Sequence, residues 1–241
     1  MSFHFPKAAG FASALTLLAG VASAATLAPG GTIPMPGTTA AANPELAGVV
    51  IQDSVVSTPN VAVPALPVNF ARFEVQNRVV ESAVDAAMVF APRILFGSNV
   101  TAGNLLVDRV EMTGWGSFGI DAFYRTDGLG DRGPTFGSRS ADGDQLTFDF
   151  GFPLVISNLF AGPQEESHFF ALKTDATAYE NRGRVSIFAR AAGDNFNTYR
   201  FDVGGIAVPA LAPVPLPAPL LFLISGFAAL AGLRLHRSRS A

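Results

Sequence analysis

Short runs of alternating apolar and polar residues fill most of the middle of the chain. In residues 145–150 leucine or phenylalanine stands at every second position and the residues between them are polar. Residues 199–203 and 73–76 repeat this alternation. A period of two with one polar face predicts half-buried β-strands. Further strands are predicted at 49–56, 88–96, 105–112, 118–124, 169–173 and 184–190.

Turn-forming dipeptides such as Asp127-Gly128 and Asp142-Gly143 separate these runs. Only residues 82–87 are ambiguous, since they are also compatible with a helical turn or two. About nine short strands without a long helical period predict an all-β domain over residues 47–206. We expect an antiparallel β-sandwich of jelly-roll or immunoglobulin-like topology. The Gly-, Pro- and Thr-rich segment 26–46 is predicted to be a flexible leader.

The N-terminal residues 1–25 have the pattern of a secretory signal peptide. Lys7 supplies a positive charge before the apolar residues 8–20. Ala22 and Ala24 then place small side chains where signal peptidase requires them. We predict cleavage after Ala24, or as a second choice after Ala25. The alternative is an uncleaved N-terminal anchor.

The C-terminal residues 207–241 have three parts in a fixed order. A proline-rich linker over 207–218 ends in a five-residue motif, an apolar run covers 219–233, and a basic tip covers 234–241. The run is short against the ~20 residues that span a bilayer, but it is long enough if it starts at Ala218 and the arginines snorkel. Arginines at the far end predict a cytoplasmic tip and an exported domain. The motif is Val214-Pro215-Leu216-Pro217-Ala218, and the basic residues are Arg234, Arg237 and Arg239.

These parts resemble the PEP-CTERM class of sorting tails, in the variant whose signature is the same Val-Pro-Leu-Pro-Ala string. The resemblance implies transient anchoring in the inner membrane of a Gram-negative bacterium and cleavage near the motif by an exosortase, a membrane protease or transpeptidase. It also implies delivery to the cell surface or exterior, in bacteria that make exopolysaccharide and biofilm. The more common form has Pro-Glu-Pro, whereas Leu216 stands between the prolines here. The alternative is a permanent single-pass anchor without processing.

Composition narrows the class of protein further. All 19 acidic residues lie between Glu45 and Asp202, but only 12 of the 16 basic ones do, so the domain is acidic. An acidic domain argues against nucleic acid as a partner, because phosphates require a basic face. The chain has no cysteine, which excludes disulfides and thiolate chemistry.

Few residues of the middle have side chains suited to catalysis. It contains one histidine, His168, and one lysine, Lys173, and no Gly-x-Ser-x-Gly motif. We therefore predict no catalytic residues. Two carboxylates would suffice for sugar hydrolysis, but the chain has too many acidic side chains for the sequence to indicate one pair. Calcium is the one cofactor that the sequence suggests, because several aspartates lie on glycine-containing loops. The candidate ligands are Asp127, Asp131, Asp142 and Asp144.

Three functions fit this sequence. The first is a non-enzymatic surface or matrix protein with adhesive or exopolysaccharide-binding contacts, for which Trp115 is the candidate aromatic platform under a sugar ring. The second is an exported enzyme that acts on polysaccharide through two carboxylates. The third is a structural envelope protein that keeps its anchor. The scarcity of histidine and lysine favours the first.

Overall fold

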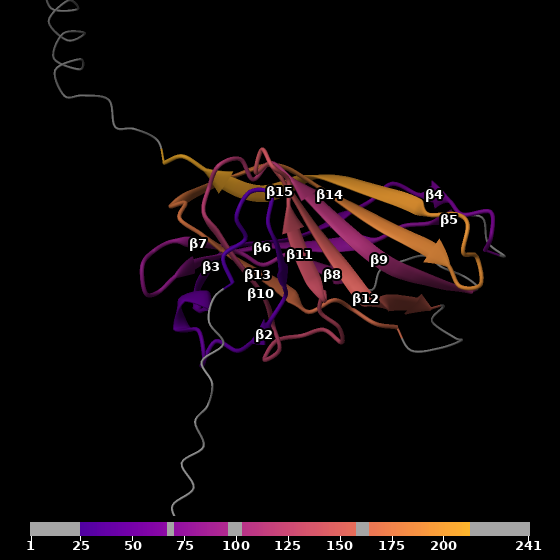
Figure 1. Ribbon diagram of the computed structural model, residues 1–241, viewed down its shortest axis with the longest axis horizontal. Helices are drawn as coiled ribbons and strands as arrows, with labels where there is room; N and C mark the ends of the chain where they lie inside the picture. The colour runs from indigo at the N-terminus through magenta and orange to yellow at the C-terminus, as the bar shows by residue number, and fades with distance from the viewer. Residues whose placement is uncertain (1–24, 67–69, 96–102, 158–163, 213–241) are drawn as a thin grey trace, which may run out of the picture.

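The computed structural model describes residues 25–66, 70–95, 103–157 and 164–212, and these form an all-β protein with mainly antiparallel sheets (Figure 1). One 3-10 helix, η1 (Pro44–Leu46), is the only helical element among them. The first sheet has six strands, in the order β1 (Thr32–Pro34), β11 (Phe136–Arg139), β12 (Gln145–Ser157), β9 (Asn104–Thr113), β14 (Ala178–Ala191) and β15 (Tyr199–Ala210).

The second sheet has seven strands. Six of them lie in the order β2 (Gly37–Thr38), β10 (Ile120–Arg125), β13 (Phe169–Thr174), β7 (Met88–Phe90), β6 (Glu74–Ser82) and β3 (Gly48–Ser57). The seventh, β8 (Arg93–Leu95), also pairs with β6. β2 pairs with β10 in parallel, and the other pairs are antiparallel. A separate two-stranded sheet joins β4 (Val61–Ala62) to β5 (Phe70–Ala71).

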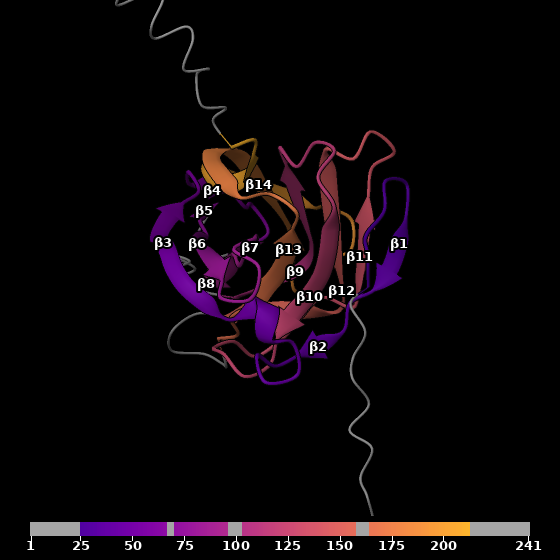
Figure 2. The same ribbon diagram turned by 90° about the vertical axis from the view of Figure 1, so that its left-hand side faces the viewer.

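The two sheets face each other across one apolar core, as in a β-sandwich. Phe148 and Ile187 enter it from the six-stranded sheet, and Phe90 and Leu172 enter it from the seven-stranded sheet. In a view turned by 90° from Figure 1, the strands of both sheets curve around this interior (Figure 2). The predicted period of two is confirmed in β12, where residues 146, 148 and 150 are buried and Asp149 is exposed.

Most predicted strands occur close to their predicted bounds, but the run 88–96 is divided. β7 ends at Phe90 and β8 begins at Arg93. Pro92 lies between them, and a proline cannot donate a backbone hydrogen bond to a neighbouring strand. The ambiguous residues 82–87 form a turn between β6 and β7 and no helix. β11 was not predicted, because its four residues are too few to show a period.

The segment 26–46 was predicted to be a flexible leader outside the domain, and the structure instead packs it onto the domain. β1 pairs with β11, and β2 pairs with β10. Leu27, Met35 and Leu46 are buried, with 0%, 6% and 1% of their surface exposed. Strands of two or three residues show no periodicity, so the composition suggested flexibility where isolated apolar residues anchor the chain. At the other end, β15 continues to Ala210, past the predicted boundary at residue 206.

Part of this segment crosses the outer face of the seven-stranded sheet, and we call residues 39–47 the strap. Its Leu46 packs against a second apolar cluster, whose other members come from β6, β7, β10 and β13. This face therefore has apolar cover from η1, and open hollows lie beside it. The other members of the cluster are Val80, Val89, Phe123 and Ala171.

Candidate functional site

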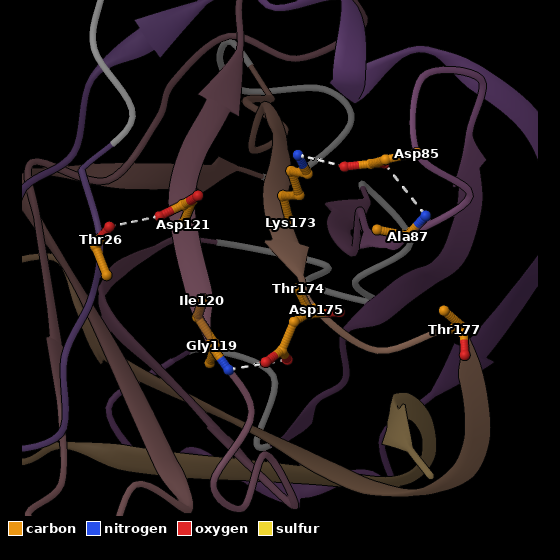
Figure 3. Close-up of a pocket in the computed structure, with 10 residues that line it drawn as sticks. All are labelled: Thr26, Asp85, Ala87, Gly119, Ile120, Asp121, Lys173, Thr174, Asp175 and Thr177. Atoms are coloured by element: carbon orange, nitrogen blue, oxygen red, sulfur yellow. Dashed lines mark hydrogen bonds and ion pairs between the residues drawn. The ribbon is translucent and has the colours of Figure 1, made fainter. Parts of the chain in front are cut away.

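A cleft of about 400 Å³ lies on the seven-stranded sheet (Figure 3). It lies where β10 begins and β13 ends. Ile120 and Leu172 point into the core. Asp121 follows Ile120 and Lys173 follows Leu172 in the chain, so both of these side chains point outward into the cleft. The full lining is Thr26, Asp85, Ala87, Gly119, Ile120, Asp121, Lys173, Thr174, Asp175 and Thr177.

Strand pairing brings the charged groups of the cleft together. Asp121 and Lys173 are direct partners in the antiparallel pair of β10 and β13. Asp175 follows two residues after Lys173, and its Oδ1 accepts a 3.0 Å hydrogen bond from the Gly119 amide. In Figure 3 the Lys173 side chain stands between Asp121 on one side and Asp85 on the other. The cleft therefore contains three carboxylates and one ammonium group, and the ammonium group is paired with Asp85.

Asp85 reaches the cleft from the turn between β6 and β7. The Lys173 Nζ lies 2.8 Å from its Oδ2, and the Ala87 amide donates to its Oδ1 at 3.2 Å. The hydrogen bond from Lys173 lowers the pKa of the Asp85 carboxyl, and this outweighs the small desolvation of the group. The next residue, Ala86, has φ of 56°, a left-handed conformation that costs a residue with a Cβ about 1–2 kcal/mol. The turn therefore accepts backbone strain while it presents Asp85.

The loop beneath the cleft is held by a buried arginine. Arg139, 5% exposed, donates from its NH2 nitrogen to the carbonyl oxygens of Gly116 at 2.7 Å and Phe118 at 2.9 Å. It also donates to the carbonyls of Gly143 at 2.9 Å and Leu27 at 3.2 Å. Burial lowers the pKa of the guanidinium, opposed by the charge of Asp175. The Arg139 side chain thus holds the residues just before β10 and the residue that follows Thr26.

A second hollow of about 220 Å³ is lined by Leu46. Arg78 and Arg125 also line it, and Arg78 stacks on the Phe169 ring at 4.5 Å. Arg78 lies 2.6 Å from Asp53, and Arg125 lies 2.8 Å from Asp127. We regard the larger cleft as the candidate site, because it combines threonine hydroxyls with three carboxylates and one ammonium group.

The aromatic platform predicted at Trp115 is wrong. The side chain is 1% exposed and packs edge-to-face on Phe90, with ring centroids 5.3 Å apart. A sugar ring has no access to either face of the indole. The glycines on both sides of Trp115 suggested an exposed loop, but they allow the chain to turn the indole into the core, with φ of 104° at Gly114 and 54° at Gly116.

The four aspartates proposed as calcium ligands accept hydrogen bonds from backbone amides. Three of them join distant segments: Asp127 accepts from the Ala40 amide at 2.9 Å, Asp131 from the Glu166 amide at 2.8 Å, and Asp144 from the Gly116 amide at 3.2 Å. Asp142 accepts from the Asp144 amide at 3.1 Å, as in a local Asp-containing turn. Over the described ranges, no three acidic or histidine side chains gather closely enough to hold a metal ion.

Glu165 and Glu166, which precede β13, are both paired with arginines. Arg132 lies 2.6 Å from Glu165, and Arg93 lies 2.8 Å from Glu166. His168 is half-buried and stacks on Tyr124 with ring centroids 5.5 Å apart. The segment before β13 is thus attached to three parts of the domain.

Several predicted site residues lie outside the described part of the chain. These are the signal-peptidase residues Ala22 and Ala24, the motif 214–218, the apolar run 219–233 and the three terminal arginines. In the described ranges, no helix has the length and hydropathy needed to cross a membrane.

No protein-family model, no curated protein and no solved structure matches this chain. The cleft residues must therefore be judged on their own chemistry. Sequence reasoning gave Lys173 no place in a site and overlooked Asp85, Asp121 and Asp175. For Asp121 and Lys173 the one signal was a polar residue at an outward position of a strand, which does not reveal that β10 and β13 are neighbours.

Proposed function

We propose that this chain is an exported, exosortase-processed protein of the cell surface or extracellular matrix, whose β-sandwich binds polysaccharide without acting as an enzyme. The observation that carries the proposal is the open cleft lined by threonine hydroxyls, three carboxylates and one ammonium group. Such groups donate and accept the hydrogen bonds that sugar hydroxyls require. The volume of about 400 Å³ accommodates one or two sugar rings.

The electrostatics of the carboxylates favour binding over hydrolysis. A glycosidase needs one carboxylic acid whose pKa is raised, so that it is protonated near neutral pH. Among the described residues, each carboxylate with a shifted pKa has it lowered, and Asp85 in the cleft is one of them. Hydrogen bonds and nearby cations hold these groups in the charged form. They are suited to accept hydrogen bonds and unsuited to donate a proton.

The strand pairing favours a jelly roll over an immunoglobulin-like topology. β11 pairs with β12, β10 pairs with β13, and β9 pairs with β14. These three pairs are nested in the chain, and the outer and inner pairs lie in one sheet while the middle pair lies in the other. A long hairpin rolled over two sheets produces this pattern.

Export and anchoring are supported by the two ends of the sequence. The signal-peptide pattern and the terminal arginines indicate the same orientation, with the acidic domain outside the cytoplasm. The domain lacks cysteine, so it needs no oxidative folding in that compartment.

Glycan binding is tested with the processed full-length protein on a glycan array, followed by calorimetry with any polysaccharide bound. Lys173→Met and Thr177→Val remove hydrogen-bonding groups from the cleft and should weaken binding at least tenfold. Thr147→Val, on the outer face of the other sheet, is the matched control and should bind as wild type. Binding that survives both cleft variants would place the glycan elsewhere, and release of reducing ends would favour the enzyme.

Processing is tested by intact-mass analysis of the protein recovered outside the cell. We expect a chain that begins at Ala25 or Thr26 and lacks residues 220–241. A chain that still ends at Ala241 would contradict processing and favour the permanent anchor.

A further inference from the structure

The first described residues of the chain form the wall of the cleft. The Leu27 amide donates to the Ile120 carbonyl at 2.8 Å, and the Ala122 amide donates to the Ala25 carbonyl at 3.2 Å. These two bonds make Thr26 the direct antiparallel partner of Asp121. Side chains of such a pair lie on the same face. The Thr26 hydroxyl indeed donates to Asp121 Oδ1 at 2.7 Å (Figure 3).

We propose that removal of the signal peptide creates a new α-ammonium group that pairs with Asp121 and completes the cleft. The inference rests on the export proposed above. Cleavage after Ala24 places the new charge on Ala25, one residue from the partner of Asp121. Cleavage after Ala25 places it on Thr26 itself. The predicted cleavage positions therefore coincide with the point at which the chain begins to pair with β10.

The charges around the cleft favour one more cation. Four side chains face the site, namely Asp121 on β10, Lys173 on β13, Asp175 after β13, and Asp85 on the turn between β6 and β7. Lys173 forms its ion pair with Asp85, and Asp175 accepts from the Gly119 amide. Asp121 bonds to the neutral Thr26 hydroxyl. An α-ammonium group at residue 25 or 26 adds the positive charge that three carboxylates and one lysine lack.

An ion pair at this position makes stability depend on pH in a defined window. An ordinary α-amino group has a pKa of about 7.7–8.0. A nearby carboxylate favours its charged form and raises the pKa in the folded protein. A raised pKa contributes stability that is complete below about pH 8 and is lost as the pH rises through the folded value.

The experiment uses the mature protein, dimethylated on its amines with carbon-13 and titrated by NMR. Removal of the signal peptide also removes Lys7, so only the α-amine and Lys173 carry the label. We expect the pKa of the α-amine to be higher in the folded wild type than in the same protein unfolded in guanidinium. Asp121→Asn should remove most of this difference, and Asp149→Asn, on the other sheet, should retain it.

The outcomes separate this inference from the proposed function. Intact mass first establishes whether the chain begins at Ala25 or Thr26, and any other start contradicts the proposed processing. With the expected start, equal pKa values in folded and unfolded wild type overturn the ion pair even if glycan binding is found. This comparison needs no variant, so a folding defect of Asp121→Asn does not weaken it.

Discussion

Two arginines lie buried in this cysteine-free domain, and their guanidinium groups have different kinds of partner. The Arg93 side chain, 7% exposed, pairs with Glu166 and stacks on the Phe169 ring at 4.8 Å. Arg139 has four backbone carbonyls as acceptors. A planar guanidinium with five donors can join several segments at once. Such ties connect distant parts of the chain where a secreted domain often has disulfides.

Arg139→Met should lower the free energy of unfolding by about 3 kcal/mol, because it leaves several carbonyls in the interior without donors. Chemical denaturation at pH 7 measures the loss. The matched control is Arg72→Met, whose side chain is 44% exposed and lies 3.6 Å from Glu74. That surface pair should contribute less than about 1 kcal/mol. Equal effects of the two substitutions would contradict the role given to Arg139.

Glu165→Gln should change the acid limb of the stability curve. Burial raises the pKa of Glu165, but hydrogen bonds from Arg132 and the Val155 amide outweigh it and hold the pKa below the ordinary 4.5. A lowered pKa contributes stability above about pH 4.5 that is lost as the pH falls through the folded value. The variant should therefore be less stable by about 1–2 kcal/mol at pH 7.

Denaturation midpoints between pH 3 and pH 7 measure this difference between wild type and variant, which should shrink below pH 4.5. Glu180→Gln, at an exposed ion pair with Arg182, serves as control. A difference that stays constant from pH 3 to pH 7 would mean that the charge of Glu165 is not the cause.

At the scale of the elements, the short strap covers apolar surface on the outer face of the seven-stranded sheet. It contributes one short 3-10 helix and one fully buried leucine, yet it covers the apolar cluster of the outer sheet face. It also lines the smaller of the two hollows with Leu46 and Ala47. A segment that looked like a linker therefore shapes part of the outer face of the seven-stranded sheet.

Leu46→Ala should lower the free energy of unfolding by about 2–4 kcal/mol, because it opens a cavity over the sheet that neighbouring side chains cannot fill. Val49→Ala, only three residues later but 68% exposed, should change it by less than about 0.5 kcal/mol. Thermal or chemical denaturation distinguishes the two. A negligible effect of Leu46→Ala would restore the flexible leader that the composition suggested.

At the scale of the whole molecule, the domain and the proposed sorting tail depend on different physics. The domain is held by two sheets and one core, whereas the tail is expected to act through extended backbone, an apolar run and terminal charge. We expect prolines 215 and 217 to favour an extended motif, since each lacks an N–H and restricts the residue before it.

Substitution of Pro215 and Pro217 by alanine should leave export and membrane insertion intact but block cleavage. Helix can then propagate backward through the motif, and an enzyme that requires extended backbone loses its substrate. Uncleaved protein should accumulate in the membrane fraction on immunoblots. Changing Arg234, Arg237 and Arg239 to glutamine should instead weaken retention in the membrane. Normal processing and retention of both variants would show that these residues are no sorting signal.

The sequence by itself determined the elements with a strong local signal. Alternation in β12 and β15 predicted strands and their buried faces, because the period of two follows from the geometry of a single strand. The all-β class followed from the same pattern. Where that signal was absent, in the two- and three-residue strands of segment 26–46, composition gave the wrong answer.

Only the tertiary structure decided the site. Asp121 and Lys173 are more than 50 residues apart, and only the pairing of β10 with β13 makes them neighbours. The burial of Trp115 depends on Phe90, which is also distant in the chain. Long-range pairing depends on which faces can bury apolar surface together, and no local pattern contains that information. Hence most strands could be predicted from the sequence, and the cleft could not.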